Sequence, residues 1–366
     1  MLSDVNEKQL LVQRIRQCLL YLALVDASFL IWLLLRPILE NQGIGLVFGW
    51  NSRFVWMAWL GAAILAASRL SGRHTGQVPC LELLLPFLMM GNGAWQRLMV
   101  QHGGSHPSTD EFLFAFERNY GYLAFRMCAL FHFDWLHNAP IWYGYIRWVY
   151  WCSFLPLVVV YLYMPAGTKL RRRLWISFAQ MGVFGVLFYQ ICPAAGPIYR
   201  FPTYPLHFPI FNTPQVSFLP HAVLNAMPSL HMSMALLTLL YARYCPRWVF
   251  GGAIVFAIST AIATLSLGEH YTIDLIVSVP FVVAIDKLSN ALNNRDERRS
   301  MYLCFIIVLL WESALRRGTA LELSTPAVWL LSIGTILMPF VSIPSLAITS
   351  KKAGSFPKSA IELEEF

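Results

Sequence analysis

Residues 228–287 read PSLHMSMALLTLLYARYCPRWVFGGAIVFAISTAIATLSLGEHYTIDLIVSVPFVVAIDK. This stretch contains three apolar segments, at about 228–246, 248–267 and 269–287, and the first and third begin with polar residues. Each segment has close to the roughly 20 mainly apolar residues that a helix needs to cross a bilayer. The stretch therefore predicts three consecutive membrane-spanning helices with polar side chains at two of their ends.

The composition of all 366 residues agrees with this, because 57% are hydrophobic, 13% are charged and the mean hydropathy is +0.55. A soluble domain typically has about 45–50% apolar and about 25% charged residues, so the composition excludes a soluble globular enzyme. The net charge is +8, but there is too little polar surface for a nucleic-acid binder. The seven cysteines lie scattered, mostly in apolar stretches, and are expected to be buried thiols, not a disulfide framework.

Seven further apolar stretches predict an all-α integral membrane protein, a helical bundle of about ten transmembrane helices. The candidate spans cover about 17–36, 53–69, 80–99, 140–164, 172–191, 228–246, 248–267, 269–287, 301–316 and 326–348. The first stretch lacks a small-residue cleavage site, which favours a retained span over a signal peptide. No sequence period of 20–50 residues recurs, so a repeat architecture is not expected.

The distribution of basic residues predicts the orientation. With a cytoplasmic N-terminus, eighteen of the 27 Lys and Arg residues fall on the cytoplasmic side and eight on the other side. The positive-inside rule therefore favours cytoplasmic termini, and it places the loops 192–227 and 267–270 on the outer face. The short tails and the absence of a retention signal favour a bacterial inner membrane, with the site facing the periplasm, over a Golgi membrane, where it would face the lumen.

The polar group that opens segment 228–246 has the features of an anion site. Pro228 suits the first position of a helix, which places Ser229 and His231 in the first turn. Unpaired N–H groups at a helix start bind anions such as phosphate. A capping serine and a histidine at the level of the lipid headgroups are the alternative interpretation.

The second polar group contains His270 and Asp274, four residues apart and hence on one helical face. A carboxylate there can fix the imidazole tautomer and leave the other ring nitrogen as a nucleophile or base. The chain crosses the membrane twice between His231 and His270, so both histidines are expected at the same outer boundary. Two imidazoles facing one site, one of them backed by a carboxylate, suit phosphoryl transfer.

This chemistry also needs positive charge near the phosphate oxygens. Arg200, in the turn-rich segment 193–202, and Arg147, near the outer end of its span, are the candidates. Snorkelling to the headgroups is the alternative for Arg147.

These residues resemble the type 2 phosphatidic acid phosphatase superfamily, membrane enzymes with a six-helix catalytic core. Pro228-Ser229-Leu230-His231 is similar to its Pro-Ser-x-His motif, and His270-x-x-x-Asp274 is similar to the end of its third motif. The resemblance implies that His270 is the nucleophile, Asp274 its partner and His231 the general acid. It covers about 140–290, which gives a division into N-terminal spans with an outer interfacial segment (1–139), a catalytic core (140–290) and two C-terminal spans with a cytoplasmic tail (291–366).

Two features depart from the usual family pattern. The first motif, Lys-x6-Arg-Pro, is absent, and Ala263-Thr264 stand where the third motif has Ser-Arg. Gly196-Pro197 and the run from His270 to Asp274 resemble instead the inositol-phosphorylceramide and sphingomyelin synthase branch. That branch implies transfer of a phospho-headgroup to an alcohol through a phosphohistidine intermediate. The candidate substrate-binding residues are Arg200, Arg147, Ser229, Tyr199, Glu269 and Tyr271.

Three other functions compete with this prediction: a lipid phosphatase with the same residues, a proton-coupled transporter or flippase, and a zinc hydrolase. A transporter is expected to carry its polar residues near the middle of the membrane, whereas here they lie at span ends. The leading mechanism needs no cofactor and no metal. Its expected partners are the membrane, a phospholipid or polyprenyl phosphate donor and a lipid or polyol acceptor, and no nucleic acid.

The remaining histidines have weaker interpretations. His132, Asp134 and His137 allow a metal site, but an interfacial helix with aromatic anchors is favoured for this segment. His207 and His221 lie in the outer loop, where they either line substrate entry or are simply solvated.

Overall fold

The computed structural model describes Val12, Ile15 and residues 105–341, with gaps at 136–139, 152, 165–168, 221–222, 290 and 292–293. The three spans expected before residue 100 lie outside the described residues. So does the end of the span expected at 326–348.

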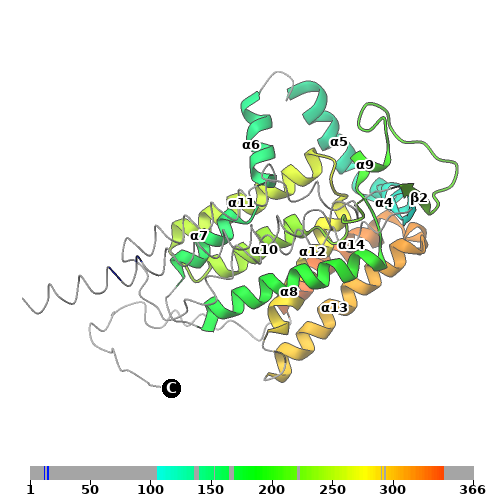
Figure 1. The fold of residues 1–366 in the computed structure, drawn as a ribbon. Coiled ribbons are helices and arrows are strands. Elements are labelled where there is room, and N and C mark those ends of the chain that lie inside the picture. Colours follow the sequence, from blue (N-terminus) through cyan, green and yellow to red (C-terminus); the bar gives the residue numbers. More distant parts are fainter. Residues whose placement is uncertain are drawn as a thin grey trace, which may run out of the picture.

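The described chain is helical apart from one two-stranded ribbon (Figure 1). In chain order the elements are β1 (Ser105–Ser108), α4 (Asp110–Phe116), η2 (Glu117–Tyr120), α5 (Leu123–Ala129), η3 (Leu130–Trp135), α6 (Pro140–Trp151), α7 (Leu155–Tyr163), α8 (Lys169–Ile191), α9 (Pro197–Arg200), β2 (Ser217–Pro220), α10 (Leu230–Ala242), α11 (Arg247–Ser266), α12 (Thr272–Leu288), α13 (Arg295–Arg316), η4 (Thr319–Glu322) and α14 (Thr325–Val341).

The two strands are an addition to the expected all-α fold. They pair antiparallel, with Ser105 opposite Pro220 and Ser108 opposite Ser217. This ribbon joins the segment before α4 to the long loop between α9 and α10, and it lies at the end of the bundle near α4 and α9 (Figure 1).

Helices α10 and α12 lie at the centre of the bundle. They pack against each other and against α8, while α10 also contacts α7 and α11, and α12 also contacts α13 and α14. Ile273, Val277, Phe281 and Ile285 of α12 have no exposed surface. A helix that is apolar and covered on nearly all sides belongs to the interior of a bundle, so α12 is held in place by its neighbours along its whole length.

Two helices of the described chain are long and apolar enough to cross a membrane, Leu170–Ile191 and Arg247–Ser266. The pair Ile141–Trp151 and Leu155–Tyr163 makes a third if it forms one broken span. Apolar helices of this kind fit a membrane protein. The expected number of about ten spans stays a prediction, because fewer described helices reach spanning length.

The span expected at 140–164 is not one straight helix. It forms α6 and α7, whose axes are bent by 64°. Pro156 lies in the first turn of α7, where its missing N–H is tolerated at a helix start but would interrupt a continuous helix. The bend changes the direction of the chain and gives α6 a separate position beside α11 (Figure 1).

Helix α10 is also shorter than the segment 228–246, because it ends at Ala242. The N–H groups of Tyr244 and Cys245 donate to carbonyl oxygens three residues earlier, in a turn that leads to Pro246. A residue that precedes proline is disfavoured in the helical conformation, which explains the early end.

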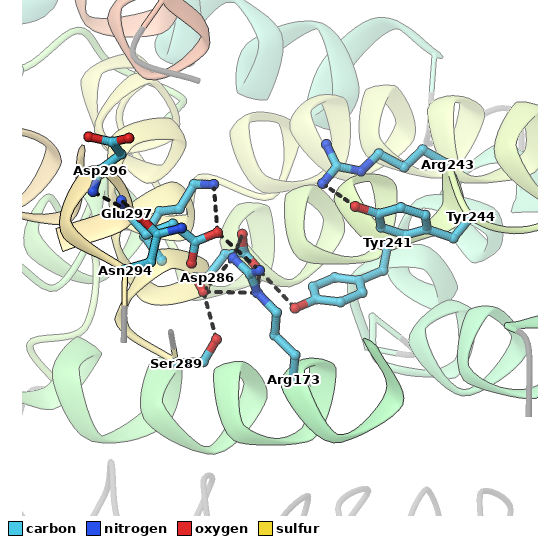
Figure 2. Close-up of polar contacts among 10 residues, drawn as sticks. Arg173, Tyr241, Arg243, Tyr244, Asp286, Ser289, Asn294, Asp296 and Glu297 are labelled. Atoms are coloured by element: carbon cyan, nitrogen blue, oxygen red, sulfur yellow. Dashed lines mark hydrogen bonds and ion pairs between the residues drawn. The ribbon is translucent and has the colours of Figure 1, made fainter. Parts of the chain in front are cut away.

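An ion-pair cluster joins four helices at the end of the bundle where α8 and α13 begin (Figure 2). Arg173 of α8 donates to both carboxylate oxygens of Asp286 on α12, at 2.9 and 2.7 Å. The hydroxyl of Tyr241 on α10 donates to Asp286 at 2.7 Å. Glu297 of α13 lies 3.4 Å from Arg173 and 3.5 Å from Lys287. Every charge in this cluster therefore faces an opposite charge or a hydroxyl donor.

Candidate active site

The first turns of α10 and α12 lie against each other. The Ser229 N–H donates to the Asp274 carbonyl oxygen at 3.4 Å, and the Ser278 hydroxyl donates to the Ser229 carbonyl oxygen at 3.0 Å. Ser229 also begins α10, since its Oγ accepts the Met232 N–H at 3.2 Å. Two motifs about forty residues apart in the sequence thus start at one place in the structure.

His270 precedes α12 and is almost fully buried. Its Nδ1 lies 2.8 Å from the Ala226 carbonyl oxygen and 3.5 Å from Asp274 Oδ2. A carbonyl oxygen only accepts hydrogen bonds, so Nδ1 carries the proton and Nε2 keeps its lone pair. The structure therefore places a nucleophilic or basic nitrogen at the start of α12, with a carboxylate behind the ring.

His231, in the first turn of α10, faces His270. The centroids of the two rings are 6.0 Å apart, at an interplanar angle of 65°. The His231 ring also stacks on Tyr150 of α6, with centroids 3.8 Å apart. The structure brings the two histidines together at one end of the bundle, as the topology predicts. The sequence did not indicate that Tyr150 of α6 packs against His231.

Asp110, at the start of α4, is a buried carboxylate that holds the loop beside His270. Its two oxygens accept the N–H groups of Ala195 and Gly196, each at 2.9 Å, and the hydroxyl of Tyr271 at 2.8 Å. Ser108 also donates to it. Burial raises the pKa of Asp110 above its usual value, while these donors act in the opposite direction. Asp110 thus fixes the residue that follows His270.

Glu117, in η2, is a second buried carboxylate at this end of the bundle. It accepts the N–H of Thr272 at 2.5 Å and its hydroxyl at 3.0 Å, at the N-terminus of α12. Burial raises the pKa of Glu117 to about 7. An acidic side chain near a helix N-terminus interacts favourably with the helix dipole. Glu117 therefore connects η2 to the start of α12, the helix that carries Asp274.

Two glycines bring the chain close to His270 at the turns beside it. Gly268 has φ +68° and Gly196 has φ +90°. A Cβ at Gly196 would lie 2.2 Å from the Glu269 carbonyl oxygen. Glycine is required there by both the backbone conformation and the close approach.

The rim of the site contains three of the predicted substrate-binding residues. Tyr199 is 58% exposed, and its hydroxyl donates to Glu269 Oε1 at 2.7 Å. Arg200 follows it in α9, but its guanidinium is bonded to Glu111 at 2.5 Å and to the Ser217 hydroxyl at 2.9 Å. A phosphate contact by Arg200 stays a prediction. In the structure, Arg200 connects α4, through Glu111, to the two-stranded ribbon, through Ser217.

Arg147 of α6 contacts aromatic residues of its own helix. Its guanidinium carbon lies 4.2 Å from the Trp151 ring centroid, and its Nη1 donates to the Tyr143 hydroxyl at 3.1 Å. Such stacking on aromatic rings stabilises a guanidinium group. The expected contact of Arg147 with phosphate stays a prediction. The contact of α6 with His231 is made by Tyr150, one turn further along the helix.

Two other predicted binding residues, Ser229 and Tyr271, have no exposed surface. The structure shows one as a helix cap and the other as a partner of Asp110.

The two further predicted histidines that the structure describes do not join this site. His132 is exposed, and its Nδ1 lies 3.0 Å from the Cys128 carbonyl oxygen. His207 is exposed in the loop between α9 and α10, whereas His137 and His221 lie outside the described residues. No group of three or more His, Cys, Asp or Glu side chains that could hold a metal ion is present in the described part of the chain.

The residues that sequence reasoning missed are the carboxylates of the interfacial segment and the Ala226 carbonyl group. Asp110 and Glu117 are seven residues apart, which is two helical turns, and both are acidic in a chain with few charges. That spacing was a usable signal. A backbone carbonyl carries no sequence signal, because every residue has one.

One comparison with known proteins gives a family match for this region. Residues 112–288, just under half of the chain, match the family model of the PAP2 superfamily, whose members are phosphatases or phosphotransferases. The match includes both histidine motifs and starts earlier than the expected boundary at about 140. No curated protein and no solved structure matches the chain. The match supports the type 2 phosphatidic acid phosphatase superfamily and hence a membrane phosphotransferase or lipid phosphatase.

Proposed function

We propose that the protein is a membrane phosphotransferase that moves a phospho-headgroup from a lipid donor to a lipid or polyol alcohol through a phosphohistidine on His270. One observation carries the proposal: Nδ1 of His270 is bonded to the Ala226 carbonyl oxygen, which leaves the lone pair on Nε2, and the centroids of the His270 and His231 rings are 6.0 Å apart. This is the arrangement of a positioned nucleophile with a proton donor on the other side of the reacting group.

In the first half of the reaction, Nε2 of His270 attacks the phosphorus of the donor lipid. The N–P bond forms as the bond from phosphorus to the leaving oxygen breaks. Protonated His231 gives its proton to that oxygen, so the first product leaves as a neutral alcohol. Asp274, 3.5 Å from Nδ1, stabilises the positive charge that develops on the His270 ring.

In the second half, neutral His231 takes the proton of the acceptor alcohol as its oxygen attacks phosphorus. The P–N bond breaks, and His270 returns to its starting state. Glu269 and Tyr199, bonded to each other at the rim, are suited to hold the hydroxyl groups of a polyol acceptor. The transfer consumes no water.

The phosphate oxygens need donors in this site. Helix α10 begins at this site, and the start of a helix favours the binding of an anion such as phosphate. Arg200 and Arg147 are the basic residues that the sequence indicates as phosphate ligands. A phosphate that binds Arg200 competes with Glu111 for the guanidinium group.

The charge distribution supports an outer location of the site. The basic residues Arg243, Arg247, Arg295, Arg298 and Arg299 flank the ends of α10, α11 and α13 that are remote from the two histidines. By the positive-inside rule that end faces the cytoplasm. We therefore place the site at the periplasmic or lumenal boundary, most consistently that of a bacterial inner membrane with both termini inside, where a lipid can present its headgroup while its chains stay in the bilayer.

A lipid phosphate phosphatase is the second candidate, and the exposed rim favours it. Tyr199 is 58% exposed, so water has access to the neighbourhood of the phosphoenzyme. The two functions share every step up to the phosphohistidine and differ only in the second acceptor.

The test uses purified full-length protein in vesicles of mixed phospholipids, with and without diacylglycerol, ceramide and inositol, in the presence of EDTA. Mass spectrometry of lipids and of free phosphate gives the products. A headgroup-exchanged lipid that still forms with EDTA supports the transferase. Free phosphate without exchange supports the phosphatase, and a fully active, folded His270→Ala/Asp274→Asn variant refutes both.

A further inference from the structure

Helix α13 carries a buried carboxyl group in the apolar part of its sequence. Glu312 has no exposed surface, and neither of its side-chain oxygens has a hydrogen-bond partner among the described residues. Helix α13 follows the region matched by the family model, which ends at residue 288. The motifs of the family therefore do not account for Glu312.

Glu312 interacts electrostatically with another acidic group, Asp274 of α12. It also interacts with Tyr189 of α8 and with Cys192, which follows α8. Helices α12 and α13 pack along each other, so the two carboxyl groups are carried by neighbouring helices. An ionised carboxylate without a partner is very costly in such surroundings, and a second carboxylate nearby increases the cost.

Asp274 has the complementary property. Its Oδ2 accepts the Tyr271 N–H at 2.8 Å and lies near Nδ1 of His270, but its Oδ1 is buried and has no partner in the described part of the chain. When two carboxyl groups near each other hold one proton between them, the proton is bound most favourably by the carboxyl group that accepts no other hydrogen bond. Glu312 is that group, because Asp274 already accepts a backbone N–H.

We propose that Glu312, in its protonated form, is a positioning residue of the active site that donates a hydrogen bond to Asp274 Oδ1 through one bridging water molecule. The inference rests on the proposed function of the His231, His270 and Asp274 set. The donated bond keeps Asp274 ionised although it is buried, and an ionised Asp274 is what stabilises the charged ring of His270. Without the donor, Asp274 takes up the proton itself and this stabilisation is lost.

The first test compares turnover in the full-length protein in detergent micelles, with dioctanoyl phosphatidic acid as the donor and inositol as the acceptor. Glu312→Gln keeps a neutral donor of the same shape, so kcat should stay within about threefold. Glu312→Met keeps the volume but removes the donor, and kcat should fall about tenfold or more with little change in KM, since a hydrogen bond to a charged group is lost. Cys304→Ala, another fully buried position of α13, is the matched control and should retain activity.

The second test is independent of turnover. The infrared difference spectrum between wild type and Glu312→Gln at pH 7 should contain the C=O band of a protonated carboxylic acid, and this band should shift in Asp274→Asn. The absence of the band overturns the proposal, and so does a Glu312→Met variant as active as Cys304→Ala.

The two levels of inference fail differently. If Asp274→Asn is inactive while Glu312→Met is fully active, the proposed function stands and the role of Glu312 falls. If wild type neither transfers nor hydrolyses any lipid phosphate, both the proposed function and the positioning role of Glu312 in it are refuted. The infrared band still shows whether the Glu312 carboxyl group is protonated.

Discussion

Helix α12 carries one buried aspartate near each end, and the two have different surroundings. Asp286 is bonded to the guanidinium of Arg173 through both oxygens and to the hydroxyl of Tyr241. Asp274 has one backbone donor and a histidine at 3.5 Å, and its Oδ1 has no partner among the described residues. Both side chains are almost inaccessible to solvent.

The difference separates a stabilising carboxylate from a candidate functional one. Asp286 forms an ion pair with the permanently charged Arg173 (Figure 2), so its negative charge is compensated within the fold. Asp274 faces a group whose charge depends on protonation. A buried polar atom that is left unsatisfied in a folded protein requires an explanation, and the one proposed for Asp274 Oδ1 is the water-mediated hydrogen bond from Glu312.

The largest expected effect is that of His270→Ala. Removal of the proposed nucleophile should lower kcat by about a thousandfold or more, since a covalent route has no substitute. Tyr241→Phe, which removes a donor to Asp286 at the other end, should leave kcat within about threefold. Lipid products measured by mass spectrometry decide the matter, and equal activity of the two variants would contradict the assignment of the ends.

Asp274→Asn and Asp286→Asn form a matched pair on one helix. The first should lower kcat by about a hundredfold or more, because the amide cannot stabilise a positive imidazole ring. The second should leave kcat nearly unchanged but lower the thermal unfolding temperature in detergent. The comparison between the two ends fails if both variants lose the same property.

Arg173→Gln and Arg200→Gln test the two ion pairs. Removal of one partner of a largely buried pair leaves the other charge uncompensated, so Arg173→Gln should destabilise the fold by about 3 kcal/mol. Arg200 is more exposed, with 22% of its side-chain surface accessible compared with 17% for Arg173, and Arg200→Gln should be less destabilising. If Arg200 exchanges Glu111 for a phosphate, Arg200→Gln should also raise KM, which Arg173→Gln should not do.

Glu117 should make the stability of the fold depend on pH. Its pKa is raised from 4.5 to about 7 in the folded protein, so the folded state binds a proton more tightly than the unfolded state. Stability should therefore fall as the pH rises from about 4.5 to about 7 and level off above, with a slope of at most about 1.4 kcal/mol per pH unit. Glu117→Gln should remove this slope from the thermal unfolding profile, and an unchanged profile would show that Glu117 does not titrate in this range.

The positions of the main helices could be predicted from apolar length and from helix start signals. The segments expected at 172–191, 248–267, 269–287 and 301–316 correspond to α8, α11, α12 and α13 within a few residues, except that α13 begins earlier. The break between α6 and α7 was missed because both halves are apolar. The count of apolar residues does not distinguish one helix from two helices at an angle.

The site was predicted only in part. The His270 and Asp274 spacing and the parity of the spans indicated which residues meet. The carboxylates Asp110 and Glu117, the packing of Tyr150 against His231 and the ion pair of Arg200 were not expected, because each depends on a contact between segments far apart in the chain.

Composition and spacing along single helices are enough to indicate that the chain is helical and apolar, that it resembles a phosphate-transferring family, and that two histidines return to one end of the helices. The packing of the helices sets the individual contacts: His270 is bonded to the Ala226 carbonyl group, Arg200 is bonded to Glu111, and Glu312 of α13 interacts electrostatically with Asp274. Hydrogen bonds and charges act over a few ångströms, so their partners are set by which helices pack together and not by the order of residues along the chain.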